Sequence, residues 1–411
     1  MSATLTIPQT MPELGIRRSL VEDLALKVLY LQGELSLIQL ADQMRVSYAI
    51  VEEVFERLRK EYLCEVKGMT GGVHRINATS QGKTRALELL SLNQYSGPAP
   101  VSLEEYVRRV REQSVRDVEV HEPDVERAFK HMVLRRETLT QLGTAIVSGR
   151  SIFLHGPTGT GKTAVAEVLP TIYHDYAWIP YAVEVDGQII TVFDAHVHER
   201  RDEPASRETD GRWVRCRRPR IVAGGELTIE MLDLQFNTIT KFYSAPLQMK
   251  ANNGVLIVDD FVRERIRPEE LLNRWMVPLD RRIDFLTLAG GKKFEIPFDL
   301  FVVFATNLNP RTLADEAFLR RIQTKVKLDY VSPQEFHEIF GRVCAELGLA
   351  YDRAAVEELI TMATEMRQPL RPCYARDIAQ HILWAARYSG QSPHLDSTSV
   401  AQAWRDYFVS D

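Results

Sequence analysis

One glycine-rich segment constrains this chain more than any other feature of its sequence. Gly156-Pro157-Thr158-Gly159-Thr160-Gly161-Lys162-Thr163 follows a short apolar stretch, 151–155, and precedes a segment of helical character. A strand, a loop of the pattern G-x-x-x-x-G-K-[ST] and a helix together form a phosphate-binding loop. The glycines let successive backbone N–H groups point inward, and the start of the helix adds partial positive charge. We therefore expect this segment to bind the phosphates of a nucleotide.

The last two residues of the loop have individual roles in this prediction. Lys162 is expected to reach the β- and γ-phosphates. Thr163 is expected to place its hydroxyl on a Mg²⁺ ion that bridges the same two phosphates.

Two further apolar stretches end in polar residues that suit the same site. Residues 254–258 lead into Asp259 and Asp260, and 300–306 lead into Asn307. We expect Asp259 to hold Mg²⁺ and Asp260 to polarise the attacking water. Glutamate is the usual base, and the shorter aspartate predicts slow hydrolysis or an intervening water. Asn307 is expected to orient that water, although asparagine is also an ordinary turn residue.

The set GPTGTGKT, GVLIVDDF, FVVFATNLNP and AFLRRI resembles, in order and spacing, the motifs of the AAA+ ATPases over residues 127–411. The resemblance implies an α/β P-loop domain, with a parallel sheet flanked by helices, and a small helical lid. It also implies hydrolysis of ATP with Mg²⁺ in a homo-oligomeric ring, hexameric or similar.

The same resemblance implies roles for four side chains. Asn307 corresponds to the sensor 1 residue, and Arg376 to a sensor 2 arginine that opens a lid helix. Arg321, with Arg320 as the alternative, corresponds to the arginine finger that reaches a neighbour's ATP and stays charged there. The other interpretation of Arg320 and Arg321 is that they form salt bridges on their own subunit.

The subfamily has two interpretations. Residues 282–297 alternate around a turn at 289–291, which resembles the pre-sensor-1 hairpin of MoxR-type ATPases, magnesium chelatase subunits and enhancer-binding activators. In those proteins the hairpin commonly lies toward the central pore. The Asp-Asp pair instead resembles the DnaA, DnaC and IstB group. We favour a MoxR-like ATPase that remodels a protein partner, with an ATP-dependent DNA-binding regulator as the alternative.

The N-terminal region, 17–92, predicts a winged helix. Two helices near 21–31 and 36–44 precede a third that starts after Ser47, an expected N-cap, and a two-stranded wing turns at Gly71 and Gly72. The third helix mixes four glutamates with three cations, so it suits protein docking better than DNA. Beyond it we expect a linker and helical segment (93–126), the large ATPase domain (127–330) and the lid (331–411).

The composition limits which cellular compartment and which binding partners we expect for the chain. The net charge of −5 argues against bulk coating of nucleic acid, and four scattered cysteines suggest a reducing cytoplasm. No apolar run is long enough to span a membrane. The basic run 212–220 is most simply a solvated loop, but Trp213 within it leaves nucleic acid or an acidic partner open. His196 and His198 alone are weak evidence for a metal.

Overall fold

Five parallel strands form the sheet that carries the phosphate loop. The computed structural model describes residues 5–201, 209–260, 265–313 and 319–408. Across this sheet the strand order is β10-β13-β16-β5-β17, and each neighbouring pair is parallel. The strands are β5 (Ile152–His155), β10 (Arg220–Gly224), β13 (Val255–Asp259), β16 (Phe301–Thr306) and β17 (Thr324–Lys327). The phosphate-loop strand β5 and the acidic strand β13 are therefore separated by β16.

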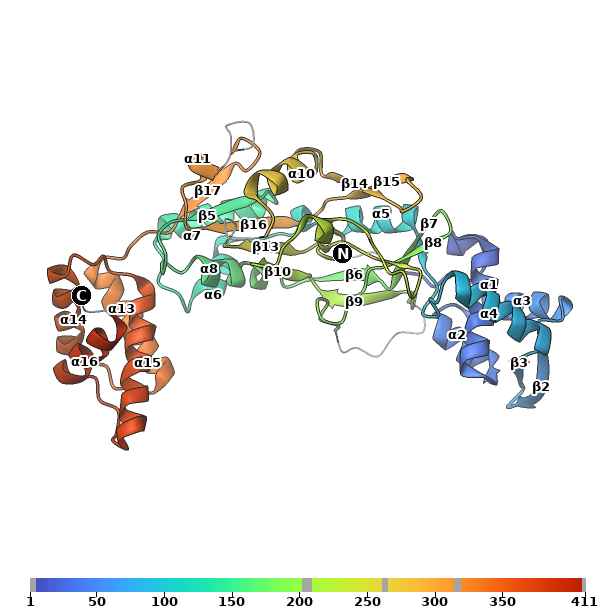
Figure 1. Cartoon of the computed structure of the whole chain (residues 1–411), viewed down its shortest axis with the longest axis horizontal. Helices are drawn as coiled ribbons and strands as arrows, with labels where there is room; N and C mark the ends of the chain where they lie inside the picture. Colours follow the sequence, from blue (N-terminus) through green and yellow to red (C-terminus); the bar gives the residue numbers. More distant parts are fainter. Residues whose placement is uncertain (1–4, 202–208, 261–264, 314–318, 409–411) are drawn as a thin grey trace.

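Helices cover both faces of this sheet, because its central strands are apolar on both sides (Figure 1). On one face, α6 (Glu122–Phe129), α7 (Arg136–Ser148) and α8 (Lys162–Val168) share a core with β5, β13 and β16. On the other face α10 (Pro268–Arg281) buries Trp275 against Phe298 and Phe304. The expected fold class, an α/β P-loop fold with a parallel sheet flanked by helices, is confirmed.

A second layer of strands lies between the five-stranded parallel sheet and the N-terminal region (Figure 1). One sheet has the order β11-β12-β8-β7-β4, and a separate antiparallel pair joins β6 to β9. These strands share a hydrophobic core with α5 (Leu103–Glu112). Their bounds are β4 (Val101–Ser102), β6 (Tyr176–Pro180), β7 (Ala182–Val185), β8 (Gln188–Thr191), β9 (Trp213–Arg217), β11 (Gln235–Phe236) and β12 (Tyr243–Ser244).

The predicted hairpin before the third apolar strand is confirmed as β14 (Ile283–Thr287) and β15 (Lys293–Pro297), which pair antiparallel. Its inner face is not free. Leu286, Phe294 and Ile296 are buried in the core of the second layer, so the hairpin is fastened to the body of the molecule along one side.

The basic run 212–220 is not a solvated loop, and the simplest sequence interpretation was wrong. The run forms β9, a short connection and the start of β10. Arg212 is fully buried and Arg218 is 9% exposed. Trp213 is also buried and cannot stack on a nucleic-acid base. Acidic side chains and backbone carbonyls distant in sequence make this burial of arginine tolerable.

The N-terminal region has the element order expected of a winged helix. In chain order the elements are α1 (Arg18–Gln32), β1 (Leu35–Ser36), α2 (Leu37–Met44), α3 (Tyr48–Lys60), β2 (Cys64–Thr70), β3 (Val73–Ala78) and α4 (Ser80–Leu92). Its sheet has the order β1-β3-β2, with β2 and β3 forming an antiparallel hairpin. Ser47 occupies the N-cap position of α3, but its side chain makes no capping hydrogen bond, and its buried hydroxyl has no partner among the described residues.

The segment 93–102, predicted as a linker, is packed against both of its neighbours. Gln94 N–H donates to the Thr240 carbonyl, and Ala99 N–H donates to that of Met44. Tyr95 is buried, and Val101 belongs to β4. The N-terminal region is therefore attached to the second layer by hydrogen bonds and not only by a chain connection.

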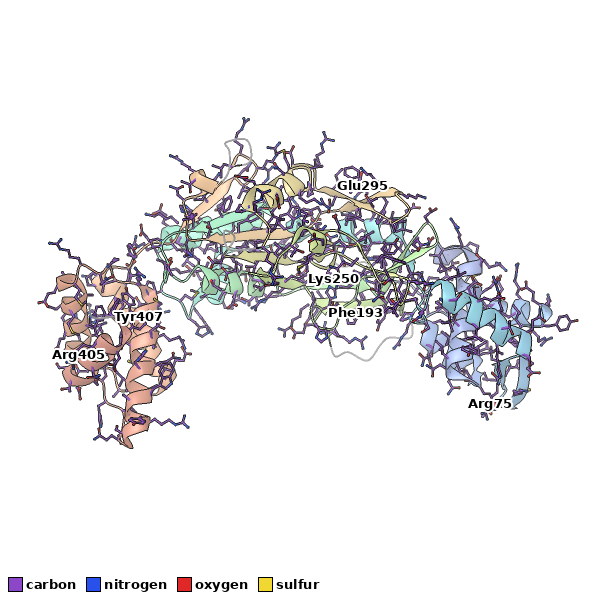
Figure 2. The ribbon with its side chains drawn as sticks, in the orientation of Figure 1. Arg75, Phe193, Lys250, Glu295, Arg405 and Tyr407 are labelled. Atoms are coloured by element: carbon purple, nitrogen blue, oxygen red, sulfur yellow. The ribbon has the colours of Figure 1, made fainter. Side chains whose placement is uncertain are left out.

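The C-terminal part, which the sequence predicts to be a lid and which is called the lid below, is a separate four-helix bundle with its own core. Its helices are α13 (Pro333–Leu347), α14 (Arg353–Glu365), α15 (Pro372–Ser389) and α16 (Ser397–Tyr407). Ser332 starts α13 with a capping box that includes Glu335. Arg75 on β3 and Arg405 on α16 lie at opposite ends of the elongated molecule (Figure 2).

Short elements complete the described chain. They are η1 (Pro12–Leu14), η2 (Val115–Asp117), η3 (Leu169–Ile172), η4 (Ile229–Leu232), α9 (Leu247–Lys250) and α11 (Pro310–Leu313). Among the residues described, no helix is long and apolar enough to cross a membrane.

Candidate nucleotide-binding site

The phosphate loop is shaped by glycines that no other residue could replace without strain. Gly156 and Gly161 have φ values of 145° and 88°. A Cβ on Gly156 would lie 1.9 Å from the carbonyl oxygen of Leu328, which follows the neighbouring strand β17. The loop therefore runs close against the sheet before α8 begins at Lys162.

Lys162 is held within the loop itself. Its Nζ donates a 2.8 Å hydrogen bond to the Pro157 carbonyl, and Thr160 Oγ1 donates to the same oxygen at 2.9 Å. Burial lowers the pKa of Lys162, while the negative charges of Asp259 and Asp260 act in the opposite direction. An ammonium group already stripped of most of its water is well prepared to bind phosphate oxygens.

The acidic strand β13 brings Asp259 to the loop. Thr163 Oγ1 donates to Asp259 Oδ2 at 2.9 Å, so a hydroxyl and a carboxylate share one point at the cavity wall. Mg²⁺ prefers oxygen ligands of these two kinds. The donor set fits the ion, and Thr163 and Asp259 are the residues that would hold it.

Asp260 directly follows β13, and β16 pairs with that strand. Asp260 therefore lies next to the tip of β16. Asn307 Nδ2 donates to Asp260 Oδ1 at 3.1 Å, and the Asp260 N–H donates to Asp259 Oδ1 at 3.0 Å. Asp260 has a left-handed backbone with φ of 50°. Non-glycine residues in this region are uncommon, and such strain clusters at functional sites.

One cavity of about 650 Å³ connects these groups, a size typical of small-molecule sites. Six of the eight loop residues line it, from Thr158 to Thr163, while Gly156 and Pro157 do not. The other predicted residues that line it are Asp259, Asp260, Asn307 and Arg376.

Arg376 reaches this cavity from the lid. It lies on α15 and donates from Nη2 to Glu346 Oε2 on α13 at 2.5 Å. The first turn of α15 also touches the phosphate loop, since Cys373 N–H donates to the Gly159 carbonyl at 3.2 Å. The lid is therefore in direct contact with the loop that we expect to bind phosphate.

The cavity is also lined by residues that sequence analysis missed. They are the segment 131–134 before α7 and two apolar side chains of α13, Ile339 and Val343. Apolar residues of this kind would cover the faces of a nucleotide base. They carry no motif, and the sequence signal available for them is the short apolar run Met132–Leu134.

Arg320 and Arg321 lie elsewhere. Neither lines the cavity, Arg320 is exposed and Arg321 is half-buried. Ala317 and Phe318, the first two residues of their motif, fall outside the described residues. His198 is buried in a structural role, where Nδ1 accepts from the Asp194 N–H and Nε2 pairs with the Lys250 carbonyl. Within the described ranges, no group of three or more His, Cys, Asp or Glu residues could hold a metal.

Comparisons with known proteins give one family match and several remote structural likenesses. The model "Domain of unknown function (DUF8689)" matches residues 332–406, which is the helical lid. A comparison with curated proteins gives no match.

Three solved structures illustrate the structural likenesses. The RuvB Holliday junction branch migration motor of Thermotoga maritima has 14% identity and a TM-score of 0.39, covering 71% of each chain. Domain III of the Thermotoga maritima replication initiation protein DnaA has 12% identity and a TM-score of 0.40, covering 71% of this chain and 100% of that one. NtrX from Brucella abortus, in complex with ATP, has 14% identity and a TM-score of 0.38, covering 77% of this chain and 63% of its own. Likenesses this remote do not transfer an activity or a partner to this chain.

Proposed function

We propose that this chain is an ATPase that binds ATP with Mg²⁺ and hydrolyses it in a ring-shaped homo-oligomer. The observation that carries the proposal is the single cavity in which the phosphate loop, the acidic pair, Asn307 and Arg376 meet. These groups come from β5, β13, β16 and the lid. Four separate elements that supply complementary groups to one cavity are hard to explain by any purely structural need.

Each side chain has a defined task in the proposal. Lys162 binds the phosphate oxygens, and Thr163 with Asp259 holds Mg²⁺, which neutralises charge on the transferring phosphate. Asp260 takes the proton of the attacking water, and the amide of Asn307 fixes the direction in which that carboxylate points. Arg376 leaves Glu346 for the γ-phosphate, because the phosphate carries more negative charge than one carboxylate.

Arg321, or Arg320 in its place, acts on a neighbouring subunit in this proposal. The motivating observation is that both lie away from the cavity of their own chain. The test mixes Arg321→Ala protein with Lys162→Ala protein, each inactive alone. Mixed rings would contain sites with an intact phosphate loop and an intact arginine, so turnover should partly recover. Failure to recover turnover at any ratio, with mixed assemblies demonstrated, would remove the trans role.

In our proposal the chain is a MoxR-like ATPase that remodels a protein partner, and the N-terminal winged helix recruits that partner. The two arginines of α3 already have carboxylate partners, since Arg57 pairs with Glu22 and Glu61, and Arg59 with Glu56. Arg212 and Arg218 of the basic run are buried. These two surfaces therefore offer few unpaired cations to a DNA backbone, which disfavours the DnaA-, DnaC- or IstB-like alternative.

Binding to duplex and single-stranded DNA, with and without ATP, separates these alternatives. Several phosphate contacts would appear as a steep loss of affinity with salt. We expect no such binding at low salt. Salt-dependent binding that also requires ATP would favour the DNA-binding regulator instead.

A further inference from the structure

One arginine of the lid forms hydrogen bonds with the backbone of the segment just before α7, which lines the cavity. Arg342 on α13 donates from Nη1 to the carbonyl oxygens of Lys130 and Met132, at 2.8 and 2.9 Å. Its Nη2 donates to Glu338 Oε1 at 2.6 Å, one turn earlier on the same helix. Arg342 itself lines the cavity, as do His131 and Met132.

These contacts help to fix the position of the segment 131–134. The segment leaves α6 in a turn, closed by a hydrogen bond from Met132 N–H to the Phe129 carbonyl at 2.8 Å, and its residues belong to no strand or helix. Met132 and Leu134 pack against the core beneath β5, while the two carbonyls are held by Arg342. A backbone segment of this kind needs partners for its carbonyls. The planar guanidinium of Arg342 supplies two such partners from one rigid group, which a lysine ammonium on a flexible stem would not do with equal geometry.

A nucleotide base that binds beside the segment 131–134 would face both that segment and the apolar side chains of α13. We propose that Arg342 is a positioning residue that sets base selectivity, because it holds residues 130–132 in the register needed to read the edge of an adenine. This inference rests on the proposed nucleotide binding. Arg342 acts through the backbone that it holds and not through contact with the phosphates.

A second arginine provides a matched control. Arg135 also ties α13 to the region before α7, with Nε and Nη2 donating to Glu335 at 2.8 and 3.2 Å. Its other hydrogen bond goes from Nη2 to the Tyr330 carbonyl and not to Lys130 or Met132. Arg135 does not line the cavity. Loss of Arg135 therefore loosens the lid without freeing the segment that faces the base.

The experiment measures equilibrium binding of fluorescent ATP and GTP analogues to the full chain. We compare the wild type with Arg342→Gln, Arg342→Lys and Arg135→Gln, with melting curves for each to establish folding. We expect the wild type to prefer ATP. Arg342→Gln should weaken ATP binding about tenfold, which corresponds to about 1.4 kcal/mol, and should bring the ATP-to-GTP affinity ratio close to one. Arg342→Lys keeps the charge and most of the side-chain stem. Its ATP affinity and its ATP-to-GTP affinity ratio should therefore lie between those of the wild type and those of Arg342→Gln.

The ratio distinguishes positioning from simple attachment of the lid. Arg135→Gln should preserve the ATP-to-GTP ratio even if both affinities fall. Equal effects of Arg342→Gln and Arg135→Gln on the ratio would overturn the inference, and so would a wild type without base preference. A wild type that binds neither nucleotide would overturn the proposed function itself, and this inference with it.

Discussion

Asp260 is the residue at which the site departs most from the usual Asp-Glu pair. It is one methylene shorter than glutamate, and its backbone adopts the left-handed region with φ of 50°. The hydrogen bond from Asn307 aims one carboxylate oxygen, so the backbone conformation and the amide together define its position. A strained residue held in this way suits a group whose direction matters for reaction.

We expect Asp260→Asn to separate binding from turnover. Lys162, Thr163 and Asp259 would still supply the phosphate and metal contacts, so ATP affinity should stay near the wild-type value. Loss of the base should lower kcat by a factor of about 10² to 10⁴. Asp259→Asn is the control, and it should instead weaken Mg²⁺-dependent binding. Wild-type turnover in Asp260→Asn would refute the assignment.

Gly159 is a second residue on which the site depends. Its φ is 80°, and a Cβ there would lie 2.6 Å from Cys373 Sγ and 3.3 Å from Arg371 Cδ in the lid. We expect Gly159→Ala to displace the first turn of α15 and to weaken ATP binding by at least about fivefold, because the strain costs on the order of 1 to 3 kcal/mol. Gly290→Ala is the control, since its site is open and its φ is not positive. Titration with a fluorescent ATP analogue measures the affinity of both variants. Equal affinities for Gly159→Ala and Gly290→Ala would contradict the proposed contact between the loop and the lid.

At the scale of elements, the packing of α1 on α4 buries a cation. Lys27 is 5% exposed and donates from Nζ to the Asn93 carbonyl at the end of α4, at 3.1 Å. Burial lowers the pKa of Lys27 from 10.5 to about 8, although the charge of Asp23 opposes the shift. Below pH 8 both folded and unfolded chains carry the proton, and the folded state bears the full cost of the buried charge.

This pKa shift predicts a stability that rises with pH. Between about pH 8 and 10.5 the unfolded chain binds more protons than the folded one, so the contribution of Lys27 to unfolding free energy increases across that window. Lys27→Met should remove the rise. We expect the free-energy difference between wild type and mutant to change by about 2 kcal/mol, in favour of the wild type, from pH 7 to pH 10. Urea denaturation at both pH values tests this, and a constant difference would contradict it.

At the scale of the whole molecule, Arg212 joins parts that are far apart in sequence. Its guanidinium forms a salt bridge with Asp210 and donates to Glu105 Oε2 and to the carbonyls of Leu14 and Pro100. It thereby ties the start of the chain, the segment before α5 and the strand β9 into one body. The contacts are structural, which is why the same arginine is not accessible to a nucleic acid.

We expect Arg212→Met to destabilise the protein by about 3 to 5 kcal/mol, because Asp210 would remain buried without its partner. Arg217→Met is the matched control, at the last residue of β9, the strand that Arg212 directly precedes. Its side chain is 69% exposed and its ion pair with Glu199 is long, at 3.4 Å, so a change within about 0.5 kcal/mol is expected. Urea denaturation measures both. Similar small effects would mean that the buried network contributes little.

The sequence by itself determined the parts of the candidate site that are formed by residues adjacent to one another along the chain. The phosphate loop, Asp259 with Asp260, and Asn307 could each be predicted because a strand, a tight turn and a polar residue follow one another directly. The helices and the β2–β3 hairpin of the N-terminal region, and the hairpin β14–β15, could be predicted for the same reason, since hydrophobic periodicity and turn glycines are local signals.

Tertiary structure alone decided which distant groups meet. The strand order brought Asn307 to Asp260, and the lid brought Ile339, Arg342 and Val343 to the segment 131–134. It also decided that Arg212 is buried, because its carbonyl partner Leu14 lies 198 residues away in sequence. Burial and electrostatics depend on distances in space, and a sequence pattern records only distances along the chain.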